Sequence, residues 1–223
     1  MKSKRKLIIA IDGPAGSGKS SVTKIVAQRL GIPYIDTGAM YRSVTLKGMR
    51  EGVDLTNGRA LAAVAKKAKI RLSARGGKQK VFLDGKDVTK AIRTPELTKN
   101  VVFAAREPLV RREMVRQQRL MGKESGAAME GRDIGTVVFP KADFKFFFVA
   151  DPDVRALRRY KELVQAGKKV SLAEVLADLQ KRDNSDIRRK EGPLRRAKDA
   201  ILVDTTSLTI EGTVDKILAR VRQ

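Results

Sequence analysis

Apolar residues along this chain fall into two patterns that alternate. Short runs that are apolar at nearly every position predict strands buried on both faces, as in a parallel sheet. These runs lie at 7–11, 32–35, 126–129, 144–150 and 200–203. The segments between them carry apolar residues at helical spacing, for example from 21 to 30. This alternation predicts an α/β fold, with a five-stranded parallel sheet flanked by helices and joined by right-handed crossovers.

One internal segment departs from the alternation. Residues 70–74 and 80–83 alternate or run apolar with Gly76-Gly77 between them, which is the pattern of a β-hairpin. A turn at Asp84-Gly85 leads to a short third strand predicted at 87–88. We therefore expect a small antiparallel β subdomain inserted into the α/β chain.

Residues that start or stop helices mark several boundaries. Gly31 predicts the end of the first helix, and Asp36 or Thr37 predicts the cap of the second. Thr94-Pro95 and Asp151-Pro152 each combine a capping side chain with a proline in the first turn of a helix. Two helix starts are therefore predicted at these pairs.

Apolar periodicity, capping residues and charge predict the structure of three further segments. A capping box from Ser171 to Glu174 predicts another helix start. A long basic helix is expected from about 107 to 123, with Leu109 and Leu120 on its apolar side together with Val110 and Met114. Residues 181–198 are rich in arginine and interrupted by a Gly-Pro pair, so we expect an exposed loop there.

The first predicted strand and helix enclose the motif G-x-x-x-x-G-K-[ST], which runs from Gly13 to Ser20. Its glycines let the backbone curl so that N–H groups converge on phosphate oxygens at a positive helix end. Lys19 would reach the β- and γ-phosphates, and the Ser20 hydroxyl would contact Mg²⁺. The predicted ATP-binding residues are Gly13, Pro14, Ala15, Gly16, Ser17, Gly18, Lys19, Ser20 and Ser21. The alternative, a Gly-rich turn that binds nothing, is disfavoured by the strand and helix on either side.

The amino-acid composition excludes several kinds of catalytic chemistry. The 223 residues include no cysteine and no histidine, which excludes disulfides, thiolate catalysis and the usual neutral-pH proton shuttle. The formal charge is +23, so the chain attracts anions, and a nucleic-acid-binding NTPase is an alternative. Aromatic residues make up only 4% and no nucleic-acid-binding motif is found, so no specific nucleic-acid partner is expected. Without an apolar stretch of membrane length or a signal sequence after residues 1–6, we expect a cytoplasmic protein with no membrane partner.

Several blocks of the sequence resemble the bacterial cytidylate kinase family. They are Ile11 to Ser20, Asp36 to Arg42, Ile92 to Pro95, Glu130 to Pro140 and Lys181 to Asp186. The blocks follow the family order over nearly the whole chain, and the second and fourth are more specific than the first. The resemblance implies a monomeric nucleoside monophosphate kinase that converts ATP and CMP or dCMP to ADP and CDP or dCDP with Mg²⁺.

The resemblance also implies one cytidylate kinase domain, residues 1–223, divided into three parts. The core comprises 1–36, 106–153 and 193–223, the monophosphate-binding part comprises 37–105 with the hairpin insert, and the lid region comprises 154–192.

Residue roles follow from the matched blocks. The resemblance implies that Arg42 and Arg132 hold the acceptor phosphate near Thr37, with Arg189 arriving from the lid. Lys19, Arg132 and Arg189 are the expected catalytic residues. A phosphate acceptor is already ionised at neutral pH, so the reaction needs positioning and charge stabilisation rather than a general base.

The resemblance further implies that Arg111 and Asp133 read the cytosine edge, and that Arg182 and Asp186 bind the ribose. An Asp can accept a hydrogen bond from the exocyclic amine that distinguishes cytosine from uracil. One position departs from the family pattern, because Val102 stands where the family usually has a serine nine residues before the base-reading arginine. If that register holds, one hydrogen bond worth about 1 kcal/mol is lost.

Other assignments remain open. A kinase of another small acceptor, such as UMP, shikimate or dephospho-CoA, is the alternative within the kinases, although the insert and the Gly-Arg-Asp block argue against the last two. A GTPase switch is disfavoured, because no Asn-Lys-x-Asp motif is found. Asp151 follows an apolar strand as a metal-binding Asp does in other NTPases, but Asp151-Pro152 is better interpreted as a helix cap.

Overall fold

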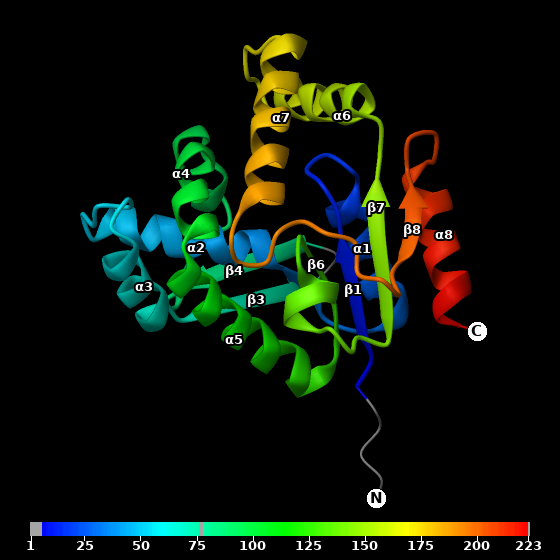
Figure 1. The fold of residues 1–223 in the computed structure, drawn as a ribbon, viewed down its shortest axis with the longest axis horizontal. Helices are drawn as coiled ribbons and strands as arrows, with labels where there is room; N and C mark the ends of the chain where they lie inside the picture. Colours follow the sequence, from blue (N-terminus) through cyan, green and yellow to red (C-terminus); the bar gives the residue numbers. More distant parts are fainter. Residues whose placement is uncertain (1–5, 76–77, 223) are drawn as a thin grey trace, which may run out of the picture.

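A five-stranded parallel sheet forms the centre of the chain in the computed structural model, which describes residues 6–75 and 78–222 (Figure 1). The predicted Gly76-Gly77 turn and residues 1–5 lie outside the described residues. The strand order is β2-β6-β1-β7-β8. The strands are β1 (Ile8–Asp12), β2 (Tyr34–Asp36), β6 (Ala127–Gly131), β7 (Phe144–Val149) and β8 (Ile201–Asp204). The predicted fold class is confirmed.

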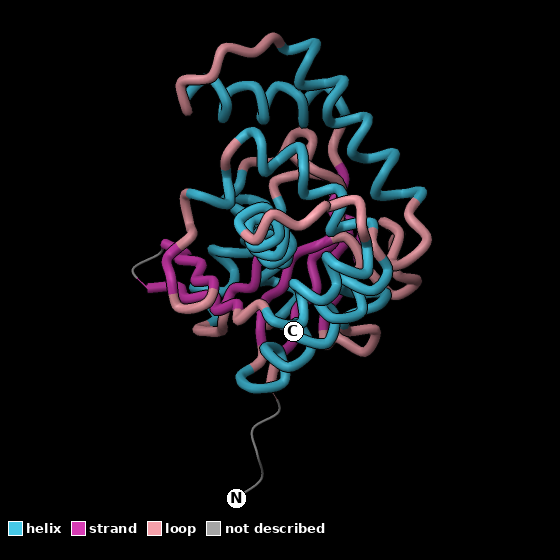
Figure 2. Tube along the Cα trace, turned by 90° about the vertical axis from the view of Figure 1, so that its left-hand side faces the viewer, coloured by secondary structure: helices cyan, strands magenta, loops and turns pink. Residues whose placement is uncertain are grey.

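Helices flank this sheet and cover its two faces (Figures 1 and 2). Their bounds are α1 (Lys19–Leu30), α2 (Thr37–Arg50), α3 (Gly58–Lys67), η1 (Ala91–Arg93), α4 (Pro95–Arg106), α5 (Pro108–Ser125), η2 (Ile134–Val138), α6 (Pro152–Gln165), α7 (Leu172–Arg188) and α8 (Ile210–Val221). The predicted caps at Asp36, Thr94, Asp151 and Ser171 are confirmed, because each side chain accepts a backbone N–H of its helix. Asp151 is therefore a helix cap, as interpreted from the sequence.

The parallel strands bring three loops to one edge of the sheet. In the strand register, Asp12 at the end of β1 lies beside Gly131 of β6, and Asp36 at the end of β2 lies beside Glu130. The loops that follow these strands therefore start next to one another, at the carboxyl edge where open α/β sheets bind ligands.

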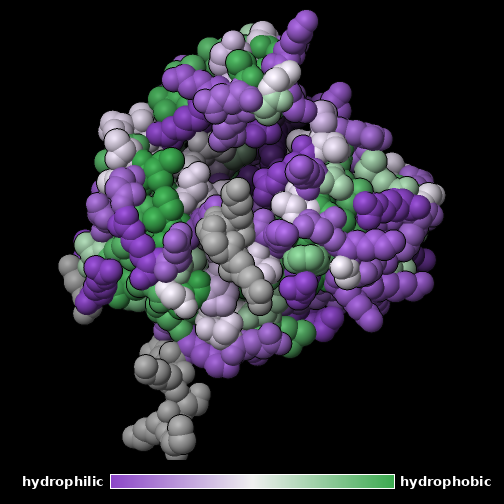
Figure 3. All heavy atoms as spheres, turned by 180° about the vertical axis from the view of Figure 1, so that it is seen from behind, coloured by the Kyte–Doolittle hydropathy of each residue, from purple (hydrophilic) through white to green (hydrophobic). Residues whose placement is uncertain are grey.

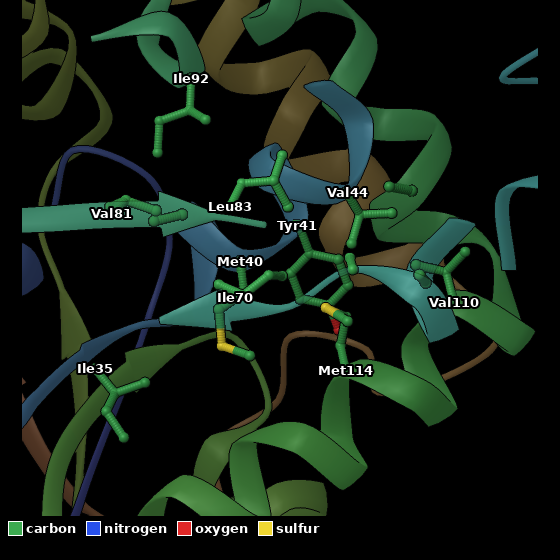
Figure 4. Close-up of a cluster of buried hydrophobic side chains, with 14 of the residues drawn as sticks. Ile35, Met40, Tyr41, Val44, Ile70, Val81, Leu83, Ile92, Val110 and Met114 are labelled. Atoms are coloured by element: carbon green, nitrogen blue, oxygen red, sulfur yellow. The ribbon is translucent and has the colours of Figure 1, made fainter. Parts of the chain in front are cut away.

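Side chains of β1 alternate between two apolar clusters, as expected for a strand buried on both faces. Ala10 belongs to a cluster that includes residues of α2, α5 and the insert, whereas Ile9 and Ile11 pack with residues of α1, β7 and α8. Figure 4 shows Met40 and Tyr41 of α2 lying with Met114 of α5 in the first cluster. The chain has a core on each face of the central sheet.

The predicted insert is present as a second, antiparallel sheet. It contains β3 (Ile70–Arg75), β4 (Lys78–Leu83) and β5 (Lys86–Asp87), in that order. Asp84 and Gly85 have φ values of 50° and 83°, the positive angles that a tight two-residue hairpin turn requires. Val81 and Leu83 are buried in the same cluster as Met40, so the insert is packed against the body of the protein.

The helices α6 and α7 project beyond the carboxyl edge of the central sheet (Figures 1 and 2). They share a small cluster of buried residues, formed by Ala15, Ala156, Val175 and Leu179. No helix in the described part of the chain is long and apolar enough to cross a membrane.

Two expectations are wrong. The segment predicted as an exposed loop at 181–198 is helical as far as Arg188, where α7 ends, and Asp186 in this segment is buried. Asp183 and Asp186 in this segment turn inward and form ion pairs with Arg155 and Arg132. On α5, Val110 and Met114 are buried, but Leu109 and Leu120 are 41% and 50% exposed, because only a narrow face of this helix contacts the core.

Candidate functional site

The loop between β1 and α1 presents its backbone to a ligand. Gly18, at the start of α1, has a φ of 82° and no side chain caps the helix there. Lys19 is only 4% exposed, and its Nζ atom lies 2.6 Å from the carbonyl oxygen of Pro14 and 3.3 Å from Oγ of Ser17. Burial, and then the nearby Arg132 cation, lower the pKa of Lys19 to about 7. An anion in this loop would restore the charge on Lys19.

Asp12 fixes the Gly-Arg-Asp block against this loop. Its carboxylate, at the end of β1, accepts hydrogen bonds from the N–H groups of Ile134 at 2.8 Å and Gly135 at 2.7 Å. Burial raises the pKa of Asp12 to about 6, although these two N–H groups lower it. The turn η2 is a single turn of π-helix, a rare element that often occurs at functional sites. Asp12 lies within a matched block, but no role was predicted for it.

An alternating chain of charges links the acceptor-side residues predicted from the sequence. Asp186 of α7 lies 2.6 Å from Nε of Arg132 and 3.3 Å from Nη1 of Arg189. Asp133 lies 2.5 Å from Nη2 of Arg111 on α5 and 3.5 Å from Nη2 of Arg189. Three separate segments, α5, the start of η2 and the end of α7, thus contribute to one network.

Two arginines beside this network, Arg42 and Arg182, form no close ion pair with a carboxylate among the described residues, although Asp36 and Asp186 favour their charged forms. Arg42 of α2 has a buried Nε atom without a hydrogen-bond partner. Burial is the main cause that lowers the pKa of Arg42, and neighbouring arginines add to it. Burial and then the cations of Arg132 and Arg42 lower the pKa of Arg182 to about 10. Clustered arginine cations, one of them with a buried N–H that lacks a partner, are costly without a counter-charge, so this region is suited to a multiply charged anion.

Glu130 lies between the first turn of α1, which carries Ser20, and the start of α2 at Thr37. No role was predicted for it from the sequence. Tyr34 donates to its Oε1 atom at 2.7 Å. Burial and then Asp36 raise the pKa of Glu130, although an interaction with the Ser20 side chain lowers it. Thr37 is buried and donates to the backbone carbonyl of Glu130 at 2.7 Å. An acidic residue at the end of a buried strand was the available signal, but it was treated only as part of a matched block.

Helix α6, which follows β7, contributes another residue for which no role was predicted from the sequence. Arg155 is 7% exposed and donates to the carbonyl of Ala15 in the loop at 3.1 Å. Arg158 on the same helix donates to the carbonyl of Thr205 at 2.6 Å. Val102 is half-buried on α4, one turn before Ala105, whose carbonyl accepts from Nη1 of Arg111 at 3.0 Å.

The family model for cytidylate kinase matches residues 9–223. The cytidylate kinase of Bacillus subtilis is 48% identical over 219 residues, which cover 98% of each chain. The chain belongs to the cytidylate kinase family. The cytidylate kinase of Desulforamulus reducens is 50% identical over 215 residues, or 96% of each chain, and that of Geobacter sulfurreducens is 46% identical over 99% of this chain and 94% of the relative. A crystal structure of an uncharacterised protein from Eubacterium ventriosum has the same fold, with a TM-score of 0.55 at 13% identity over 98% of this chain and 99% of that chain.

In this member of the cytidylate kinase family, the surface is hollowed beneath the projecting α6 and α7, and hydrophilic side chains dominate the face shown in Figure 3. The charges of Arg132, Glu130, Arg182 and Asp186 all shift the pKa of Lys19. The loop after β1 and the arginine-rich region are therefore close enough for their charges to interact.

Proposed function

We propose that this protein transfers the γ-phosphoryl group of ATP to CMP or dCMP, forming ADP and CDP or dCDP. The observation that carries the proposal is the gathering of cations beside the network of Arg132, where Nε of Arg42 has no hydrogen-bond partner and burial and neighbouring arginines lower the pKa values of Arg42 and Arg182. A triphosphate in the loop of Lys19 would face this second anion pocket at the same strand edge.

The residues supply positioning and charge rather than proton transfer. The loop from Gly13 to Ser21 binds the triphosphate through backbone N–H groups, and Lys19 stays with the γ-phosphoryl group. Arg42 holds the acceptor phosphate, while Arg132 and Arg189 stabilise the charge that spreads over the migrating group. Transfer breaks the bond between the γ-phosphorus and the β,γ-bridging oxygen and forms one to an acceptor phosphate oxygen, so no proton is lost from the acceptor.

The acceptor nucleoside would be read by the remaining predicted residues. Asp133, held by Arg111, accepts from the exocyclic amine of cytosine, and Arg182 and Asp186 bind the ribose. Thr37 supports the acceptor phosphate through its contact with the strand end at Glu130. Because Val102 offers no hydrogen bond to the base, discrimination against UMP rests on Asp133 and Arg111.

The site has a donor set that fits Mg²⁺. The described residues contain no cluster of three or more acidic residues able to hold a metal by themselves. Mg²⁺ in phosphoryl-transfer sites usually takes one or two protein oxygens together with phosphates and waters. Ser20, whose side chain interacts with the buried carboxylate of Glu130, would supply the protein oxygen. Mg²⁺ neutralises charge on the β- and γ-phosphates when it is bound.

A coupled assay of ADP release with Mg-ATP tests the proposal. CMP and dCMP should be the best acceptors in a panel with UMP, AMP, GMP and shikimate. Faster turnover of AMP or shikimate than of CMP would overturn the assignment. Binding to DNA or RNA that is tight and resistant to salt would favour the alternative of a nucleic-acid-binding NTPase. The monomeric state and the cytoplasmic location stay predictions.

Replacement of Arg132 tests the catalytic assignment. Arg132→Ala should lower kcat by about 100-fold or more, because it removes a donor to charge that develops in the transition state. The KM for ATP should change much less. Steady-state kinetics with both substrates varied measures this, and near-normal kcat/KM for CMP would remove Arg132 from the site.

A further inference from the structure

The loop that binds the triphosphate uses its carbonyl groups as well as its N–H groups. The carbonyl of Pro14 accepts from Nζ of Lys19 at 2.6 Å and from Oγ of Ser17 at 3.0 Å. The carbonyl of Ala15 accepts from Nη1 of Arg155 at 3.1 Å, and the carbonyl of Ser17 accepts from Oγ1 of Thr205 at 3.1 Å. Three loop carbonyls therefore accept hydrogen bonds from side chains. Two of these side chains, those of Arg155 and Thr205, lie outside the loop.

These bonds determine which way the N–H groups face. A trans peptide unit is planar, and its C=O points opposite to the N–H of the next residue. When Arg155 holds the carbonyl of Ala15, the N–H of Gly16 is turned to the other side of the chain. Thr205 turns the N–H of Gly18 in the same manner. A concave group of N–H donors binds an anion well only when these orientations are fixed beforehand.

Arg155 is placed to fix this orientation rigidly. It lies in the first turns of α6 and is 7% exposed. Its Nε atom donates to the carbonyl of Ala150 at 3.2 Å, and Nη1 also contacts Asp183 of α7 at 2.5 Å. A Cβ at Gly16 would lie 3.1 Å from both Cβ and the carbonyl oxygen of Arg155, so the loop packs directly on α6. One guanidinium group therefore joins the residue that follows β7, the loop and α7.

We propose that Arg155 is a positioning residue that, with Asp183, orients the triphosphate-binding loop for ATP. Asp183 keeps the guanidinium group of Arg155 aligned, and one turn later on α7 Asp186 engages Arg132 on the acceptor side. The position of α7 is thereby linked to the donor loop as well as to the acceptor network. The proposal rests on the proposed function in taking ATP as the donor.

Calorimetric titration of Mg²⁺ with a non-hydrolysable ATP analogue, and separately of CMP, tests this assignment. Arg155→Gln should weaken analogue binding about tenfold, the effect of losing one hydrogen bond of about 1.4 kcal/mol made by a charged group. CMP affinity should change less than about twofold, because no CMP contact is assigned to Arg155. Arg155→Lys keeps the cation beside Asp183, so its affinity for the analogue should lie between those of Arg155→Gln and the original protein.

A double-mutant cycle separates orientation from general weakening of the fold. Asp183→Asn should reproduce part of the ATP defect, and Arg155→Gln combined with Asp183→Asn should bind the analogue no worse than Arg155→Gln alone. The matched control is Arg29→Gln, which removes an arginine that joins α1 to Asp215 and Glu211 of α8 and leaves the loop untouched. Thermal unfolding of each free variant reports its stability.

The outcomes distinguish the two claims. Analogue affinity in Arg155→Gln equal to that of the original protein, equal losses for the analogue and CMP, or additive losses in the double variant would each overturn the role of Arg155. Failure of the original protein to bind the analogue would instead contradict the proposed function.

Discussion

At the scale of single residues, Lys19 makes ATP binding depend on pH. Its pKa in the free protein is lowered to about 7, mainly by burial. At pH 8 about nine-tenths of the molecules therefore carry a neutral Lys19, and the phosphates of ATP favour its ammonium form. Binding of Mg-ATP at pH 8 should take up about 0.9 proton, and the Kd should rise about eightfold per pH unit there.

Calorimetry in two buffers that differ in ionisation enthalpy measures this proton uptake. At pH 6 Lys19 is already charged in the free protein, so uptake should fall to about 0.1 proton. Lys19→Met should bind Mg-ATP more weakly and take up no proton at pH 8. Proton uptake in Lys19→Met equal to that of the original protein would assign the titration to another group.

The sequence predicts residues inside motifs better than residues that support them. Lys19, Arg132 and Asp133 could be named because each lies in a pattern beside a predicted strand end. Asp12 and Arg155 could not be assigned roles, because what they do depends on backbone groups of segments distant in sequence. A buried arginine on a helix has the same local sequence signal as a solvated one, and only the fold separates them.

At the scale of elements, α6 and α7 should open more easily than the rest of the protein. Their contact includes a cluster separate from the main cores, in which Leu179 is 7% exposed and packs with Val175. Leu179→Ala should cost about 2–3 kcal/mol locally, and so speed amide exchange in 152–188 about 30- to 160-fold. Exchange in β1 should stay unchanged. Mass-spectrometric hydrogen exchange measures both.

Leu172→Ala is the matched control, because Leu172 lies on the same helix but is 44% exposed. It should accelerate exchange less than about twofold, since an exposed leucine leaves no cavity when it is shortened. Equal acceleration in β1 and in 152–188 after Leu179→Ala would show that the two helices do not open as a separate unit.

The elements themselves could be predicted wherever periodicity and caps agreed. All five central strands and the antiparallel insert follow from apolar runs and turn residues, and Gly31 ends α1 as expected. The carboxyl-terminal half of α7 could not be predicted, because its arginines suggested a solvated loop. In the structure Asp183 and Asp186 of this half form ion pairs with Arg155 and Arg132, and the helix continues to Arg188. Charge pattern alone does not reveal which partners the fold supplies.

At the scale of the whole molecule, the charge of +23 should accelerate the arrival of both substrates. ATP and CMP are anions, and a positive field over a hydrophilic surface raises their association rate. Raising NaCl from about 0.05 M to about 0.5 M shortens the Debye length several-fold, so the association rate constants should fall about tenfold. Dissociation should change less than about twofold, because buried contacts are screened far less.

Stopped-flow binding of fluorescent ATP and CMP analogues measures these constants, and a fluorescent cytidine derivative without phosphate is the control. Its association should be insensitive to salt, because an uncharged ligand is not steered by the field of the protein. A fall for cytidine as large as that for CMP would mean that salt alters the site itself. A salt effect confined to dissociation would instead place the electrostatic contribution in the contacts of Lys19, Arg42 and Arg182, and not in the charge of the whole surface.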